Sequence, residues 1–228
     1  MRKRVARCTI GIAMAACPTT AVARDDAQLW LTGGASVRID DRWRFSQETT
    51  VRLSEQRAGL SEIESNSLLG YRLARRLTVA AGYTHDPTYD HGRLAAMEHR
   101  AREQVTLDDI HVGPMTATLR LRTEQRWREG VGGTGWRARP FVRLALPLRK
   151  GSASGIAFSH ESFVNLNRNA FQAVDGEDRM RNAIALYTPV AKRLNLELGY
   201  LNQHRFATRT AESGCDHAAT LSLNMAFR

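Results

Sequence analysis

The residues best suited to chemistry in this sequence recur at every second position of one extended segment, residues 115–128. Arg120, Arg122, Glu124 and Arg126 would all point to the same side of a β-strand. Arginine pairs with carboxylates through parallel hydrogen bonds and keeps its charge at any working pH. The chemistry that this face indicates is therefore electrostatic: it would bind anions or close a channel with ion pairs.

Neighbouring segments extend this charged face. The predicted lumen charge network consists of Arg100, Arg102, Arg120, Arg122, Glu124, Arg126, Arg137, Arg139 and Arg143. Glu48, Glu98, Glu161 and Glu197 are the acids available for pairing. Because arginines outnumber acids within 116–128 and 136–146, acids must come from opposite strands, or the free guanidinium groups must recruit anions. Two hypotheses follow: a lumen closed by ion pairs and a narrow, anion-preferring pore.

A second candidate for chemistry is the pair His160 and Ser162, two residues apart and hence on one strand face with Phe158. A histidine and a serine on a lipid-facing wall are how outer-membrane acyl hydrolases expose a nucleophile to lipid, with an acid orienting the histidine. By chain order that acid would be Glu177 or Asp178. The competing interpretation is two polar residues near a loop.

The elements that must position these residues are short alternating segments. No apolar run after residue 23 approaches the ~18 to 20 residues of a membrane helix. The sequence therefore predicts an all-β fold, a closed antiparallel up-and-down transmembrane barrel. Eleven segments are countable, and single-chain bacterial barrels have even strand numbers. We expect about 12 strands, with 10 as the alternative. The odd segment is residues 28–38: either a twelfth strand has not been recognised, or this segment does not cross the membrane.

The chain ends in a barrel-closing strand. Leu221, Leu223, Met225 and Phe227 alternate with polar or small residues, which is typical of the last strand of an outer-membrane barrel. Trp30, Trp43, Trp127 and Trp136 lie near predicted strand ends and would form the aromatic girdles of such a barrel.

Two positions interrupt the pattern. Glu103 falls on the side that should face lipid, which predicts a bulge or a change of register there. Pro140 cannot donate a ladder hydrogen bond, which predicts a second bulge.

The first 23 residues read as an export signal. Arg2, Lys3, Arg4 and Arg7 precede a short apolar stretch, and Ala21–Val22–Ala23 supplies small residues for cleavage. We predict a cleaved signal peptide at 1–23 and a single barrel domain at 24–228. Cleavage removes four basic residues and no acid, so the formal charge falls from +10 to +6.

The remaining chain gives no sign of a cofactor, a metal or nucleic acid. Its arginines alternate along strands instead of forming a patch, which argues against nucleic-acid binding. His204, Cys215 and His217 have a spacing that fits no standard zinc motif. The expected location is the bacterial outer membrane, with membrane lipid, lipopolysaccharide and the barrel-assembly machinery as partners and an undetermined oligomeric state. A soluble periplasmic lipocalin-like barrel is a further alternative.

Several motifs resemble an uncharacterised outer-membrane barrel family known as domain of unknown function 2490. The most specific are the Arg-x-Arg-x-Glu-x-Arg strand at 120–126 and the Glu-Leu-Gly-Tyr-Leu-Asn-Gln block at 197–203. Others lie at 29–31, 41–44, 69–73, 98–100 and 165–167, so that the resemblance covers nearly the whole chain after residue 23. The resemblance implies an outer-membrane barrel without an agreed activity. Pro140 and the final Arg228 are atypical.

Overall fold

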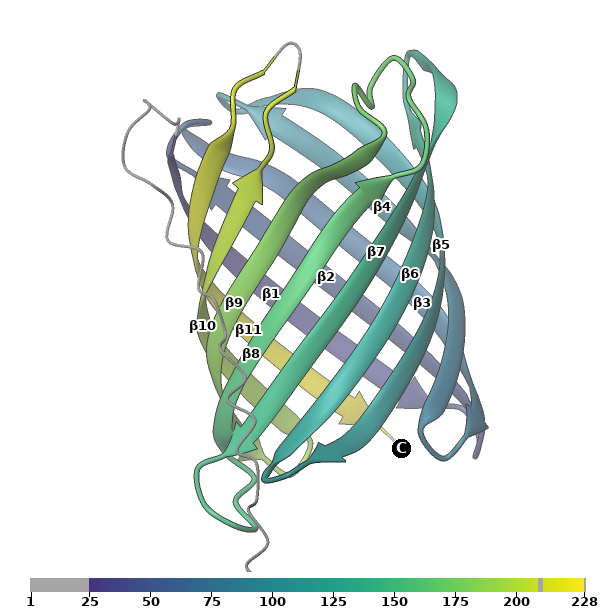
Figure 1. Cartoon of the computed structure of the whole chain (residues 1–228), viewed down its shortest axis with the longest axis vertical. Coiled ribbons are helices and arrows are strands. Elements are labelled where there is room, and N and C mark those ends of the chain that lie inside the picture. Colours follow the sequence, from purple (N-terminus) through teal and green to yellow (C-terminus); the bar gives the residue numbers. More distant parts are fainter. Residues whose placement is uncertain (1–24, 209–210, 228) are drawn as a thin grey trace, which may run out of the picture.

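The alternating segments form eleven strands in the computed structural model, which describes residues 25–208 and 211–227 (Figure 1). The strands are β1 (Asp26–Arg38), β2 (Trp43–Ser54), β3 (Gly59–Ala74), β4 (Leu77–Asp90), β5 (Arg93–Val112), β6 (Met115–Arg128), β7 (Val131–Pro147), β8 (Gly155–Asn165), β9 (Gly176–Ala191), β10 (Leu194–Arg205) and β11 (Gly214–Phe227). The predicted signal peptide and Arg228 lie outside the described residues. Within 25–208 and 211–227, no helix is long and apolar enough to cross a membrane.

The strands close into one barrel in sequence order. Every strand pairs antiparallel with the next, and β1 lies between β2 and β11. The expectation of 12 strands, or of 10, is wrong: there are eleven among the described residues. With an odd number the first and last strands run in the same direction, so β1 and β11 pair in parallel, with Leu31 beside Leu221. The segment at 28–38 is thus a full barrel strand.

Side-chain alternation divides the wall into two faces. Many large apolar side chains are exposed on the outside, among them Leu186, Leu198 and Leu223. The inside carries most of the buried polar and charged residues. Leu221, Leu223, Met225 and Phe227 lie on the outer face of β11. The prediction that Trp30 belongs to an outer aromatic girdle is wrong: its side chain points inward from β1 and is only 7% exposed.

The connections differ between the two ends of the barrel (Figure 1). At one end, called the short-turn end, the links are residues 39–42, 75–76, 113–114, 148–154 and 192–193. The other end, called the long-loop end, carries two tight turns at 91–92 and 129–130, a turn at 55–58, and the two long connections after β8 and β10. Residues 166–175, between β8 and β9, form the connection that matters for the lumen.

The irregularities expected at Glu103 and Pro140 take another form. Glu103 stays in register and exposed on the outer face, because it accepts hydrogen bonds from Thr123 Oγ1 (2.9 Å) and Gln125 Nε2 (3.3 Å) on β6. The shift in β5 comes later, between Leu107 and Ile110. At Pro140 the β7–β8 register is kept, but the ladder has a gap between Ala138↔Val164 and Phe141↔Glu161. A missing N–H removes a hydrogen bond without requiring an extra residue.

Candidate functional site

Glu124 is the centre of the ion-pair network inside the barrel. It points inward from β6 and is 1% exposed. Arg137, its direct neighbour on β7, donates to Oε2 from Nε at 2.8 Å, and Arg139 donates to Oε1 from Nη1 at 2.7 Å. Arg139 also reaches Glu161 on β8 at 2.9 Å, and Arg120 donates to the same carboxylate at 2.6 Å. One chain of charges therefore links three adjacent strands.

Glu98 on β5 organises a second group nearer the long-loop end. Arg126 on β6 binds this carboxylate through two parallel hydrogen bonds, both 2.9 Å, and Arg100 on β5 adds a third at 2.6 Å. Arg128 contributes a longer contact of 3.5 Å. Bidentate pairing of this kind fixes both the distance and the orientation of the two groups.

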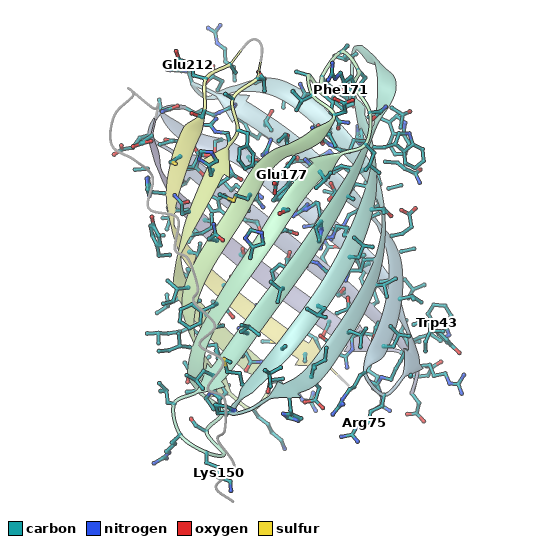
Figure 2. All side chains as sticks on the ribbon, in the orientation of Figure 1. Trp43, Arg75, Lys150, Phe171, Glu177 and Glu212 are labelled. Carbon is teal, nitrogen blue, oxygen red and sulfur yellow. The ribbon has the colours of Figure 1, made fainter. Side chains whose placement is uncertain are left out.

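The loop at 166–175 folds over this group and contacts it. Gln172, 2% exposed, accepts from Arg126 Nη1 at 2.9 Å and donates to the backbone carbonyls of Trp136 and Asn167. Phe171, labelled at the top of Figure 2, places its ring 5.7 Å from the Arg126 guanidinium. Side chains from this loop therefore help to fill the long-loop end of the lumen.

The same loop is braced on its outer side by an exposed ion pair. Arg168 Nε donates to Asp175 Oδ1 at 2.8 Å, and this hydrogen bond lowers the pKa of the Asp175 carboxyl. Both partners are more than half exposed, so the pair adds little to stability.

Further acids lie on β3 and β4. Arg52 on β2 binds Glu62 (2.6 Å) and Glu64 (3.0 Å), while Arg100 contacts Glu64 (3.5 Å) and Asp86. The ligand atoms of these three carboxylates lie within 4.8 Å of one another, which is also metal-ligand spacing. Two guanidinium groups already bind the cluster. The cluster therefore belongs to the ion-pair network.

Two inward aromatic rings support the arginines. Phe163 on β8 is 1% exposed, and the guanidinium carbons of four arginines lie near its ring. Their distances from the ring centroid are 5.2 Å for Arg137, 4.3 Å for Arg139, 5.6 Å for Arg179 and 4.6 Å for Arg181. Trp30 packs against Arg52 (4.1 Å) and Arg181 (4.7 Å). Cation–π contacts of this kind stabilise a desolvated guanidinium. The sequence interpretation missed both rings, although Phe163 shares the strand parity of Glu161.

Not every buried arginine has an acid beside it. Among the described residues, Arg102, Arg122 and Arg181 make no salt bridge; they donate to amide and hydroxyl oxygens instead. Arg122 contacts Gln104 Oε1 at 3.2 and 3.3 Å, and Arg102 contacts Thr84 Oγ1 at 3.0 Å and Asn66 Oδ1. Arg181 donates to Gln203 at 2.7 Å. The hydrogen-bond partners of these three guanidinium groups are therefore neutral side chains, and in the described part of the chain none of the three has a carboxylate in direct contact.

The lumen contains two adjoining cavities of about 290 Å³ each. Both are lined by Arg120, Arg122 and the carboxylate of Glu48. The first also has Arg102 in its wall and lies toward the short-turn end, where small or polar residues surround it: Gly34, Ser36, Ser46 and Asn224. We call this first space the arginine cavity. The second is lined by Arg52, Arg139, Arg143 and Arg181 together with Glu64, Glu161 and Glu197.

All nine members of the predicted charge network point into the lumen, in two kinds of environment. Arg100, Glu124, Arg126, Arg137 and Arg139 belong to the ion-paired layer toward the long-loop end. Arg102 and Arg122 face the arginine cavity without a salt bridge, and Glu48 is the carboxylate in its lining; Arg120 lies between the two environments. Arg143 pairs with Glu197 across the second cavity at 2.8 Å and is only half-buried.

His160 and Ser162 lie on the outer face of β8, as their alternation with the inward Glu161 and Phe163 requires. His160 Nε2 is 3.2 Å from Ser162 Oγ. The sequence predicted that Glu177 or Asp178 would orient the histidine, but the residue in contact with it is Asn182: His160 Nδ1 is 2.8 Å from Asn182 Oδ1. The β8–β9 register sets Asn182 directly opposite His160, which chain order alone could not specify.

A closed β-barrel with an interior filled by arginine–carboxylate pairs defines the class of this protein. The chain belongs to the family described as Protein of unknown function (DUF2490), which matches residues 27–213, so the predicted resemblance is confirmed. The chain is also similar to an uncharacterised protein of Methylorubrum extorquens, with 30% identity over 207 residues, 89% of this chain and 88% of that protein. No solved structure matches it.

Proposed function

We propose that this chain is an outer-membrane barrel whose lumen is closed by ion pairs toward the long-loop end and binds anions in the arginine cavity. In this view the protein is an anion-binding barrel and not a constitutive pore. The observation that carries the proposal is the pairing difference inside the lumen. One layer of arginines is ion-paired, whereas Arg102 and Arg122 make no salt bridge and line a cavity that has, among the described residues, three arginines and one carboxylate, Glu48, in its wall.

The membrane location is supported by the distribution of side chains. A closed ladder satisfies its backbone groups internally, which a structure in lipid must do. Leu186, Leu198 and Leu221 are direct cross-strand neighbours on the outer face, and exposing such an apolar surface to water would be unfavourable. A soluble lipocalin-like barrel needs the opposite arrangement, with apolar residues inside, whereas this lumen is rich in arginine. The export signal predicted at 1–23 points to the same location.

The anion hypothesis follows from the cost of burying charge. A buried guanidinium group without an opposite charge is strongly unfavourable, and arginine does not lose its proton to relieve it. Arg122 is 7% exposed and Arg102 is 3% exposed. A small oxyanion such as phosphate, sulfate or a carboxylate would neutralise both groups and use their planar sets of donors.

Anion binding is the direct test. Purified barrel in nonionic detergent should show a saturable rise in Tm with sulfate or phosphate, compared with sodium chloride at equal ionic strength. Occupancy at 100 times the Kd adds about 2.7 kcal/mol to the free energy of unfolding. Arg122→Gln should remove most of this rise. Arg76→Gln is the matched control, because Arg76 lies in an exposed turn.

The proposal of an anion site fails if the wild type shows no such rise with sulfate, phosphate or acetate. An equal rise in Arg122→Gln would also contradict it, because the anion would then bind elsewhere.

The membrane location predicts the effect of a charge on the outer face. Leu198, 49% exposed in the fifth position of β10, should tolerate alanine but not arginine. Arginine on the lipid face near the bilayer midplane costs about 2–4 kcal/mol of folding stability. Folding into lipid vesicles in urea, followed by heat-dependent gel mobility, measures the difference between Leu198→Arg and Leu198→Ala. Recovery of the wild-type chain as a soluble periplasmic protein would refute the location.

A further inference from the structure

The outer face of β8 and β9 carries a hydrogen-bonded row of serine, histidine and asparagine that the luminal function does not use. Ser162 and His160 come from β8, and Asn182 comes from β9. The donor and acceptor roles follow from the asparagine. Since Asn182 Oδ1 can only accept, the histidine Nδ1 must carry the proton at this contact. Nε2 is then free to accept the hydroxyl proton of Ser162.

We propose that Ser162, His160 and Asn182 form a serine hydrolase site for acyl esters of amphipathic lipids. Ser162 is the nucleophile, His160 is the general base, and Asn182 is a positioning residue that holds the imidazole in the required tautomer. Nucleophile, base and orienting group in sequential hydrogen-bond contact are what such a mechanism requires, on any fold. The contact distances of 3.2 and 2.8 Å fall within the range of these sites before substrate binds.

The surroundings of the three residues indicate the substrate class. The next outward pair toward the short-turn end is Phe158 and Ile184, which are cross-strand neighbours and 40% and 43% exposed. Leu186 continues this apolar surface. In the other direction, Ser162 is three residues from the end of β8. An ester group at Ser162 would therefore have its acyl chain along an apolar wall and its polar part near the barrel rim.

The rim position matches the depth at which lipid esters lie if the barrel spans a membrane, since these groups separate the hydrocarbon from the headgroups. The register also keeps the site rigid. His160 and Asn182 are directly paired in a continuous stretch of the β8–β9 ladder, and the irregularity lies beyond it, between Phe163 and Val164. Sites built on strands hold their geometry better than sites on loops.

The reaction balances with water as the second substrate. Ser162 Oγ bonds to the ester carbonyl carbon while its proton passes to His160 Nε2. The tetrahedral adduct then breaks its bond to the lipid alcohol, which leaves with that proton. Water attacks the acyl-serine and gives a proton to His160, the acyl–Oγ bond breaks, and Ser162 recovers its proton as the fatty acid is released.

Fatty-acid release from the full barrel in detergent tests the proposal. One arm uses phosphatidylcholine in mixed micelles and the other uses purified lipopolysaccharide, each with calcium and with chelator, so that the two lipid sources are separated. Ser162→Ala should lower the rate on the order of 10³-fold or more. Ser65→Ala is the matched control, because Ser65 is outward-facing on β3 and bonds Gln47 and Thr49 instead of a histidine.

Two further readouts separate catalysis from folding. A fluorophosphonate probe should label Ser162 in the wild type, as located by peptide mass spectrometry, and heat-dependent gel mobility should show that every variant is folded. Asn182→Ala should lower kcat with little change in KM, and Asn182→Asp should restore much of the loss. The absence of both release and labelling in the folded wild type overturns the proposal, as does release that persists in Ser162→Ala. Neither result bears on anion binding in the lumen.

Discussion

Replacing Glu124 by alanine is expected to destabilise the barrel by about 3–5 kcal/mol, the usual cost of removing one partner from a buried ion pair. Glu124 binds Arg137 and Arg139 at once and is 1% exposed, so its loss leaves two guanidinium groups without this partner. Arg139 keeps Glu161, whereas Arg137 keeps no salt bridge among the described residues. Denaturant unfolding in detergent or vesicles measures the loss.

The same variant tests whether the ion pairs close the lumen. In planar bilayers the wild type should conduct no steady current, and Glu124→Ala should introduce a leak that prefers anions, because unpaired arginines then line the passage. Glu197→Ala is the control, since Glu197 and its partner Arg143 are about one-third exposed and their pair should contribute about 1 kcal/mol or less. Steady conductance in the wild type would contradict the closed lumen, and cation preference would contradict the assignment of the faces.

Replacing Phe163 by alanine should cost about 3–5 kcal/mol, because the largest fully buried side chain of the lumen is removed and a cavity is left. The ring also separates guanidinium groups that would otherwise repel one another, with Arg139 at 4.3 Å and Arg181 at 4.6 Å. Phe163→Leu keeps most of the side-chain volume but loses the cation–π contacts. Its free energy of unfolding should lie between that of the wild type and that of Phe163→Ala.

Phe158→Ala provides the matched control for this prediction. Phe158 is five residues earlier on the same strand, but it lies on the outer face and is 40% exposed. Its loss should cost much less in detergent. If both alanine variants are equally destabilised, Phe163 does not act as the core of the lumen, and the arginines are held by their carboxylates alone.

The local pattern of the sequence was enough to assign the two faces of most strands. Strand alternation has a period of two residues, so Arg120, Arg122, Glu124 and Arg126 must share a face whatever the rest of the chain does. The same parity placed Leu221 and its alternate neighbours on the outside and paired His160 with Ser162. These assignments depend on only a few adjacent residues, because the alternation of a strand is the same in any sheet.

The tertiary structure decided everything that depends on register and closure. The strand number is set by how the ends of the sheet meet, and eleven strands bring β1 and β11 together in parallel. Asn182, instead of Glu177 or Asp178, reaches His160 because a ten-residue connection and an irregular ladder fix which residues of β8 and β9 are opposite. Gln172 enters the lumen from a loop that carries no periodic signal.

The division between paired and unpaired arginines has the same origin. Parity predicted that all of them point inward, but partners such as Glu161 and Arg120 are 41 residues apart and meet only across the curved wall. Whether a guanidinium group finds a carboxylate depends on its height along the barrel axis, which the stagger of all the strands sets together. Alternation along the sequence assigns each side chain to the inner or the outer face of its strand. The closed barrel determines which charged side chains can reach each other.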